Sequence, residues 1–291
     1  MTQNKPFVAL AWMLGAAASF SAMAVAGREL SVEMNTFELM LYRSIIGFVI
    51  VSALMARSRA GFAQIRTTKM PSHIKRNIFH YVGQNLWFYG VAVIPLSQLV
   101  ALEFTNPIWV ALLAPLMLGE ALTRRRVLAA MVGFVGVLIV ARPGIAPLEW
   151  GHAAGLGAAV GFAMNTIFTK RIMAIDTVLC VLFWMTLMQG VASLLLSLPG
   201  GIPIPTAAGW PWIAVVGICG LTAHYSLTSA LGAAPATVVA PLEFIRLPVI
   251  AFLGMVIYDE PIVIAVFLGA AVIITANFIN LGGRRRQIAS T

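Results

Sequence analysis

Charged residues are scarce in this 291-residue chain: Asp, Glu, Lys and Arg together make up 10% of it, whereas hydrophobic residues make up 60%. A soluble domain carries roughly 25% charged residues, which keep its surface in water. The shortage excludes an ordinary water-soluble domain and indicates a chain that uses lipid as its solvent. The net charge of +9 is therefore expected to set topology and to contact anionic lipids, with no nucleic acid as partner.

Sequence signatures of several enzymes and pumps are also absent. There is no Gly-x-x-x-x-Gly-Lys-Ser/Thr loop for a primary pump and no His-Glu-x-x-His for a zinc protease. The two aspartates, Asp176 and Asp259, lie at the ends of apolar segments, which argues against an intramembrane aspartyl protease. Cys180 and Cys219 lie inside apolar segments and are interpreted as small apolar fillers. We expect no enzyme, metal or cofactor; a lipid-modifying enzyme and a channel stay open as alternatives, because such proteins can lack sharp motifs.

Long apolar segments are what the chain has instead. A transmembrane helix needs about 20 mainly apolar residues, and ten segments are close to that length, which predicts an all-α integral membrane protein with ten transmembrane helices. The segments are Phe7–Ala26, Phe37–Ala56, Asn77–Ile94, Leu96–Leu118, Val127–Ala141, His152–Lys170, Thr177–Leu198, Trp210–Leu231, Thr237–Tyr258 and Pro261–Leu281.

The basic residues lie mostly on one side of these segments. With ten spans both termini share a side, and that side holds 15 of the 19 Lys and Arg residues, many of them in the loop Arg57–Arg76. Cytoplasmic connections carry the excess of Lys and Arg in membrane proteins. This predicts a multi-pass protein of a bacterial-type inner membrane with both termini in the cytoplasm.

The chain repeats itself. Leu-Glu-Phe occurs at Leu102–Phe104 and at Leu242–Phe244, and each copy is followed 17 positions after its glutamate by another glutamate, Glu120 and Glu260. Leu-Gly-Ala-Ala likewise begins at Leu14 and recurs in the sixth segment. Five spans per unit is an odd number, so the second unit enters the membrane from the opposite face, as in many secondary transporters. Residues 1–146 and 147–291 are thus expected to form two inverted five-helix repeats.

Several residues resemble those of a known family. Gly119-Glu120-Ala121-Leu122-Thr123, followed by Gly133, Gly136 and Val137, resembles the end of an EamA domain; Arg43 and Pro248 resemble its intramembrane arginine and its fourth-helix proline. The chain is thus similar to ten-span members of the drug/metabolite transporter superfamily with two EamA units. The resemblance implies export or exchange of small metabolites, and one branch comprises aromatic amino acid exporters of the YddG type. Met185 occupies the position in the second unit that matches Arg43.

Charged residues inside the spans are candidates for coupling or gating, because they are costly in a membrane. They are Arg43, Glu103, Glu243 and Arg246. Arg246 follows Glu243 by three residues, a spacing that lets side chains meet on a helix, so we expect an ion pair that is either structural or a latch. Glu103 has no basic neighbour in sequence and is expected to find a partner elsewhere, with Arg43 as the first candidate. Proton coupling through Glu103 stays open beside exchange or facilitated diffusion.

Polar and aromatic residues mark the expected cavity. His-Tyr pairs occur in the third and eighth segments, and Tyr81, Gln84, Asn85 and Phe88 share one helix face. We expect a cavity that suits amphipathic solutes, most of all amino acids, including aromatic and other neutral ones, carried by a monomer or weak dimer. Nucleotide-derived, sulfonium and xenobiotic solutes are the alternatives. The predicted substrate-binding residues are Tyr81, Gln84, Asn85, Phe88, Trp109, Asn165, His224, Tyr225 and Thr228.

Overall fold

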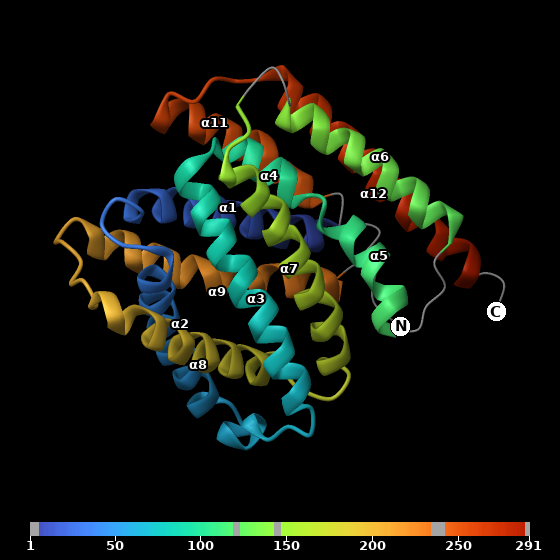
Figure 1. The fold of residues 1–291 in the computed structure, drawn as a ribbon. Helices are drawn as coiled ribbons and strands as arrows, with labels where there is room; N and C mark the ends of the chain where they lie inside the picture. Colours follow the sequence, from blue (N-terminus) through green and yellow to red (C-terminus); the bar gives the residue numbers. More distant parts are fainter. Residues whose placement is uncertain (1–5, 119–122, 143–146, 234–241, 289–291) are drawn as a thin grey trace.

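The computed structural model describes residues 6–118, 123–142, 147–233 and 242–288, and no β-strand occurs in these ranges. Figure 1 shows a bundle of helices that cross at various angles. The α-helices are α1 (Pro6–Leu30), α2 (Thr36–Arg57), α3 (Met70–Val93), α4 (Leu96–Glu103), α5 (Asn106–Leu118), α6 (Arg124–Ala141), α7 (Trp150–Ile172), α8 (Val178–Ser197), α9 (Gly209–Ala233), α11 (Arg246–Tyr258) and α12 (Ile264–Ile288). Three short 3₁₀ helices join them: η1 (Gly61–Ile65), η2 (Leu198–Gly200) and η3 (Glu243–Ile245).

Local sequence signals set the starts of α2, α3 and α8. Asn35 and Glu38 form a capping box at α2, in which each side chain accepts a bond from the other residue's backbone N–H. Thr177 caps α8 by accepting from the Cys180 N–H at 3.2 Å. α3 has proline in its first turn and begins at Met70, because proline lacks the N–H that a first turn leaves unpaired. The end of the expected loop Arg57–Arg76 is therefore helical.

The helices pack in four long pairs. α1 packs most extensively on α9 and α3 on α7, while α2 packs on α8 and α6 on α12. Figure 1 shows α6 and α12 side by side at one edge of the molecule. Small residues allow this approach: a Cβ added to Gly161 of α7 would lie 2.8 Å from the Phe79 carbonyl oxygen of α3. Each of these four pairs joins a helix of the first half to a helix of the second.

Two of the expected spans are interrupted in the middle. α4 ends at Glu103, Phe104 and Thr105 form a turn, and α5 begins at Asn106. Pro107 has no N–H to bond to the Glu103 carbonyl, so the α-helical ladder cannot continue there. The second interruption is η3, which precedes α11. The expected span Leu96–Leu118 thus contains a break between two helices, and residues 237–241 of the expected ninth span lie outside the described residues.

The surface and length of the helices fit a membrane protein. Four stretches are long and apolar enough to cross a bilayer by length and composition: Phe7–Leu30, Thr36–Arg57, Leu96–Leu113 and Val178–Gly200. Val127–Ala141 and Ile264–Ile279 are shorter apolar helices. Large apolar side chains such as those of Phe134, Leu195 and Phe252 are more than half exposed. Such an outer surface is stable only against lipid or another apolar partner.

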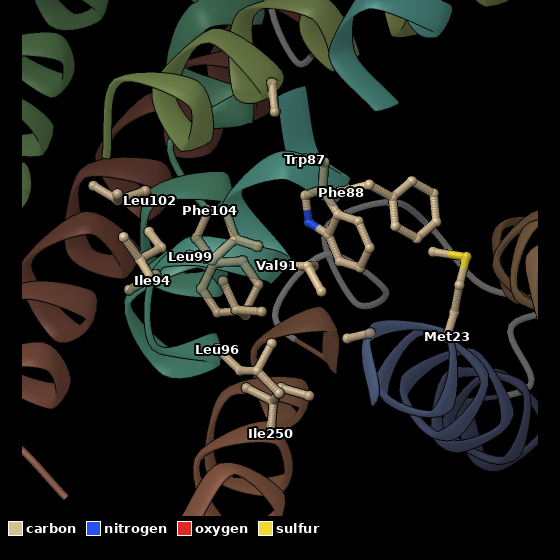
Figure 2. Close-up of a cluster of buried hydrophobic side chains, with 14 of the residues drawn as sticks. Met23, Trp87, Phe88, Val91, Ile94, Leu96, Leu99, Leu102, Phe104 and Ile250 are labelled. Carbon is tan, nitrogen blue, oxygen red and sulfur yellow. The ribbon is translucent and has the colours of Figure 1, made fainter. Parts of the chain in front are cut away.

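Figure 2 shows the largest buried cluster, where α1, α3, α4 and α11 meet. Phe88 lies there so close to α1 that a Cβ on Gly27 would be 2.7 Å from its ring. Leu96 and Ile250 close the cluster between α4 and α11. This core holds the two interrupted helices against each other and so fixes the geometry at their breaks.

Candidate functional site

The two Leu-Glu-Phe copies lie at the two helix breaks. Glu103 is the last residue of α4 and Glu243 is the first residue of η3. Phe104 and Phe244 meet edge to face, with ring centroids 4.8 Å apart. The side-chain nitrogen of Asn277, on α12, donates to the Phe104 carbonyl oxygen at 3.0 Å and satisfies a group that the break leaves without its helical partner. The repeated motif therefore marks the place where the two interrupted helices touch.

Glu103 forms an ion pair across this junction. Its Oε2 lies 2.6 Å from Arg246 Nη2 and accepts from Trp87 Nε1 at 2.8 Å. The expected partner Arg43 is therefore wrong, and so is the expected pairing of Arg246 with Glu243, which is not among the ion pairs of the described residues. The Arg246 guanidinium reaches across the junction to Glu103 on the other broken helix, and not along its own helix to Glu243.

The Arg246 guanidinium is also held by aromatic rings. Its central carbon lies 5.1 Å from the centroid of Phe20 and 5.5 Å from that of Phe104. Cation–π contacts of this kind strengthen where water is excluded, and Arg246 is buried. Arg246 thus contacts the Glu103 carboxylate and the rings of Phe20 and Phe104 at the place where the two broken helices meet.

Arg43 lies in a second polar group, between α2, α3, α8 and α9. The Gln84 amide oxygen accepts from Arg43 Nη1 and Nη2 at 2.9 and 3.0 Å, and the Gln84 amide nitrogen donates to Gln189 Oε1 at 2.9 Å. Gln189 Nε2 in turn donates to His80 Nδ1 at 3.1 Å. A Cβ on Gly220 would lie 2.7 Å from Arg43 Nε, so α9 leaves room for the guanidinium only because residue 220 is glycine.

Rings connect this group to the Glu103 junction. The His80 and His224 rings are 5.6 Å apart, and His224 lies 5.8 Å from Phe20, whose face Arg246 covers. A row of side chains in contact therefore connects Arg43 to Glu103 through amides, imidazoles and a phenyl ring. We call this row the interior path. Hydrogen-bonding groups set between aromatic walls are what a site for an amphipathic solute requires.

Among the predicted site residues, the structure brings Gln84 and His224 onto this path, along with Arg43, Glu103 and Arg246. Beside this path the hydroxyl groups of Tyr81 and Ser193 share a hydrogen bond of 2.9 Å. The Asn85 side-chain nitrogen donates to the Tyr81 carbonyl oxygen. Phe88 is part of the apolar core instead. Trp109 Nε1 donates to Thr105 beside the break, and Asn165 Oδ1 is buried without a hydrogen-bond partner.

Tyr225 does not lie where it was expected. Its side chain is 57% exposed on the outside of α9, where it meets Trp12 edge to face. Successive residues of an α-helix point about 100° apart, and here His224 faces His80 in the interior while Tyr225 lies on the outer side of α9. The placement of Tyr225 in the cavity is wrong for this reason. The side chain of Thr228 lies outside the described residues.

The bundle is closed at both ends of this path. At one end Glu260 forms an ion pair with Arg28 and accepts from the Leu96 N–H, and Arg28 also donates to the carbonyls of Val91 and Ile94. Tyr258 lies under the Arg28 guanidinium, 4.9 Å from its central carbon. We call this group the Glu260 closure. It ties the end of α1 to α3, α4 and the loop after α11.

At the opposite end, Asp176 joins the first loop to the second half of the chain. Its Oδ2 accepts from Thr67 Oγ1 at 2.6 Å and lies 2.8 Å from His73 Nε2. Cys180 Sγ lies within 4.8 Å of the other two ligand-type atoms, the one such His/Asp/Cys grouping in the described ranges. Because the same carboxylate oxygen already holds two protein partners, the group acts first as a structural tie. Cys180 and Cys219 are free thiols.

The cavity beside Arg43 is small. It is bordered by Arg43, Ser44, Thr186 and Gln189 and measures about 10 Å³, which is the room that one water molecule needs. This cavity therefore has no room for a metabolite in the conformation described.

Profile comparison matches residues 7–142 and 149–282 to the EamA-like transporter family. The chain belongs to this family. Two EamA units thus cover it almost from end to end, and both interrupted helices fall within them. The polar interior is that of an EamA-like transporter.

Curated relatives of this EamA protein are named transporters. It is 27% identical to a riboflavin transporter of Rhizobium johnstonii, over 98% of this chain and 94% of the relative. It is 23% identical to an S-adenosylmethionine uptake transporter of Rickettsia bellii, over 97% of this chain and 96% of the relative. A crystal structure of a 19% identical protein superposes with a TM-score of 0.63 over 96% of this chain and 98% of its own, which shows a shared fold.

Sequence reasoning missed several residues of the EamA interior. Gln189 is a lone amide in the apolar helix α8, a signal that was available. Arg76 was counted with the basic loop, yet it is buried within α3. Trp87 and Phe20 bind the charged groups of the junction but look like ordinary apolar residues in the sequence.

Proposed function

We propose that this EamA protein is a secondary transporter that moves a small metabolite through the interior path by alternating access. Ten transmembrane helices form two inverted five-helix repeats, residues 1–146 and 147–291. The helix pairing supports this arrangement. In the proposed repeat, α1 corresponds to α7 and α3 corresponds to α9, so the contact of α1 with α9 has its counterpart in the contact of α7 with α3. The observation that carries the proposal is the meeting of two interrupted helices at a charged interior junction, since broken helices at a repeat interface hold the substrate and ion sites of secondary transporters.

The two closures give the proposed mechanism its alternating steps. The Glu260 closure seals one end, and the tie at Asp176 seals the other. Rocking the first repeat against the second breaks one closure while the other holds, which exposes the path to one side at a time. Glu103 is held by Arg246 and Trp87 in the closed form. We favour exchange or facilitated diffusion over proton coupling, because Glu103 is already engaged by Arg246.

The substrate we propose carries a ring that fits between the His80, His224 and Phe162 side chains. His80 contacts Phe162 and His224 edge to face, and these rings supply the aromatic surfaces that such a ring would contact after they move apart. The names of the relatives favour a flavin-like or adenosyl compound, so riboflavin and S-adenosylmethionine are the first candidates. Aromatic and other neutral amino acids are the second group. A lipid-modifying enzyme is the alternative of a different class.

The protein is proposed to lie in a bacterial-type inner membrane with both termini in the cytoplasm. The Asp176 end then faces the cytoplasm, and the Glu260 closure faces outward. Cysteine placed at Ser58, next to α2, should resist a membrane-impermeant maleimide in sealed cells and react after lysis. Reaction in sealed cells would reverse the orientation. Ser290, the matching position near the C-terminus, lies outside the described residues.

Counterflow in proteoliposomes tests the proposal. Vesicles loaded with unlabelled compound should transiently accumulate the labelled compound from outside, with saturable kinetics, for at least one of riboflavin, S-adenosylmethionine, tryptophan and phenylalanine. Arg57→Gln is the matched control variant, because Arg57 is exposed at the end of α2. Flux that does not saturate would indicate a channel. A chemical product formed without transport would indicate an enzyme.

A further inference from the structure

Two guanidinium groups lie buried in the interior of the bundle. Arg43 on α2 is 5% exposed and Arg76 on α3 is 4% exposed. Neither is joined to a carboxylate in any ion pair of the described residues, whose pairs involve Arg28, His73 and Arg246. A buried charge without a counter-charge is strongly unfavourable, so these groups require an explanation beyond packing.

The polar groups around Arg43 are incomplete. Gln84 accepts from its two terminal nitrogens, but Arg43 Nε has no hydrogen-bond partner, and neither has the buried Ser44 Oγ. Arg43 and Ser44 both border the small cavity, together with Thr186 and Gln189. Unpaired buried donors are rare in folded proteins and point to a ligand or an unseen water.

Arg76 adds positive charge at the same place. Its Nε donates to Thr169 Oγ1 at 2.8 Å and its Nη1 donates to Asn77 Oδ1 at 3.0 Å, both neutral acceptors. Its Nη2 lies 4.0 Å from the sulfur of Met185, and Met185 also borders the cavity beside Arg43. Arg76 therefore contacts a methionine that borders the cavity, and its charge adds to the positive charge of Arg43 near that cavity.

Arg246 is different, because its charge is already matched by Glu103 at 2.6 Å. The two ends of the interior path therefore differ: at the junction of the broken helices Glu103 matches the charge of Arg246, whereas Arg43 at the other end has no carboxylate in an ion pair among the described residues. A solute that enters the path meets a preference for negative charge at one end only.

We propose that Arg43, with Ser44 and the Gln84–Gln189 amide pair, binds a carboxylate group of the transported molecule. This inference rests on the proposed function and specifies its substrate class: molecules with a carboxylate next to a ring-bearing body. The planar guanidinium fork matches the two carboxylate oxygens, and the ring-bearing body lies along His80 and His224. Among the candidates above, S-adenosylmethionine and the amino acids carry this group, whereas riboflavin lacks it.

Binding is tested on the purified full-length protein, independently of transport. The probes are benzoate and its uncharged amide, benzamide, at equal ionic strength, and the readout is the thermal unfolding midpoint followed by tryptophan fluorescence. Benzoate at about ten times its Kd should raise the midpoint by roughly 2–5 °C, and benzamide should not. Arg43→Gln should abolish the benzoate shift, and Arg57→Gln should retain it.

A second readout separates a binding role from a structural one. If Arg43 holds the fold, Arg43→Gln lowers the midpoint of the unliganded protein; if it awaits an anion, the midpoint stays or rises, because an unmatched charge has been removed. Arg43→Lys keeps the charge without the fork and should retain a smaller benzoate shift, which keeps the test decisive should Arg43→Gln not fold.

Three results would overturn the assignment: equal shifts with benzoate and benzamide, no shift with either, or an undiminished benzoate shift in Arg43→Gln. A shift with phenyl phosphate and none with benzoate would also overturn it, in favour of a phosphate. Failure of the proposed function is distinguishable from these outcomes. A benzoate shift that depends on Arg43, without counterflow of any candidate, leaves the carboxylate site intact and rejects the candidate substrates.

Discussion

Glu260→Gln should loosen one end of the transporter by an amount that the contacts allow us to work out. The substitution removes the ion pair with Arg28 but leaves an amide oxygen that can still accept from the Leu96 N–H. Charge-assisted bonds contribute about 1.5–3 kcal/mol each, and breaking a well-buried pair costs about 3–5 kcal/mol. The two side chains are 16% and 10% exposed, and Arg28 keeps its bond to the Val91 carbonyl oxygen. We therefore expect a loss of about 2 kcal/mol.

If that loss falls on the closed form alone, the population open at the Glu260 end rises by up to roughly 30-fold. Cysteine at Ser97 reports this opening, because Ser97 is buried in the first turn of α4 behind the closure. The assay is the rate of maleimide labelling of Ser97→Cys in nanodiscs, in a background where both native cysteines are replaced by alanine. Glu260→Gln should accelerate labelling about 10- to 30-fold.

Asp259→Asn is the matched control, because it removes a neighbouring carboxylate that is exposed in the same loop. It should leave the labelling rate unchanged. Equal acceleration in both variants would show that general loop charge matters and the Arg28 contact does not. An unchanged rate in Glu260→Gln, with a lowered unfolding midpoint, would make the pair a structural feature with no part in access.

Three further changes test the interior. Gly220→Ala places a methyl group 2.7 Å from Arg43 Nε, so the guanidinium must shift. Transport should fall at least about tenfold, and the free energy of unfolding, measured in the same preparations, should fall by about 1–3 kcal/mol. Glu103→Gln leaves Arg246 buried without its counter-charge and should destabilise the protein by about 3–5 kcal/mol; the double variant with Arg246→Gln should recover part of that loss in thermal unfolding, and an additive effect would contradict the pairing. Tyr225→Ala changes an outward-facing side chain, so counterflow should stay within about twofold of the parent, and a large loss would return this tyrosine to the pathway.

The duplication could be predicted from sequence because it left matching residues at matching positions. Leu102–Phe104 and Leu242–Phe244 are identical copies, and the structure places both at helix breaks. The break between α4 and α5 follows from Pro107, which has no N–H for the helical ladder. Helical periodicity and composition suffice for the all-helical class, and the family follows from the motifs.

Partners across the molecule could not be predicted in the same way. Glu103 finds Arg246 because two helices from different repeats cross at their breaks, a contact that no local spacing encodes. Arg76 was counted as a loop charge because it follows a basic run, and only the early start of α3 buries it. His224 and Tyr225 were placed together because both are polar aromatics, whereas the orientation of α9 turns His224 towards His80 and Tyr225 to the outer surface.

The pairing of helices across the two halves bears on how the chain is made. α1 and α3 bury themselves mainly against α9 and α7, which the ribosome has not yet synthesised when the first half leaves it. The early helices must therefore wait in the bilayer with their partner faces covered by lipid or by a chaperone, and they reach their final contacts only late in translation. Under the proposed inverted repeat, the same arrangement is what an antiparallel dimer of two separate copies would leave after a fusion of their genes.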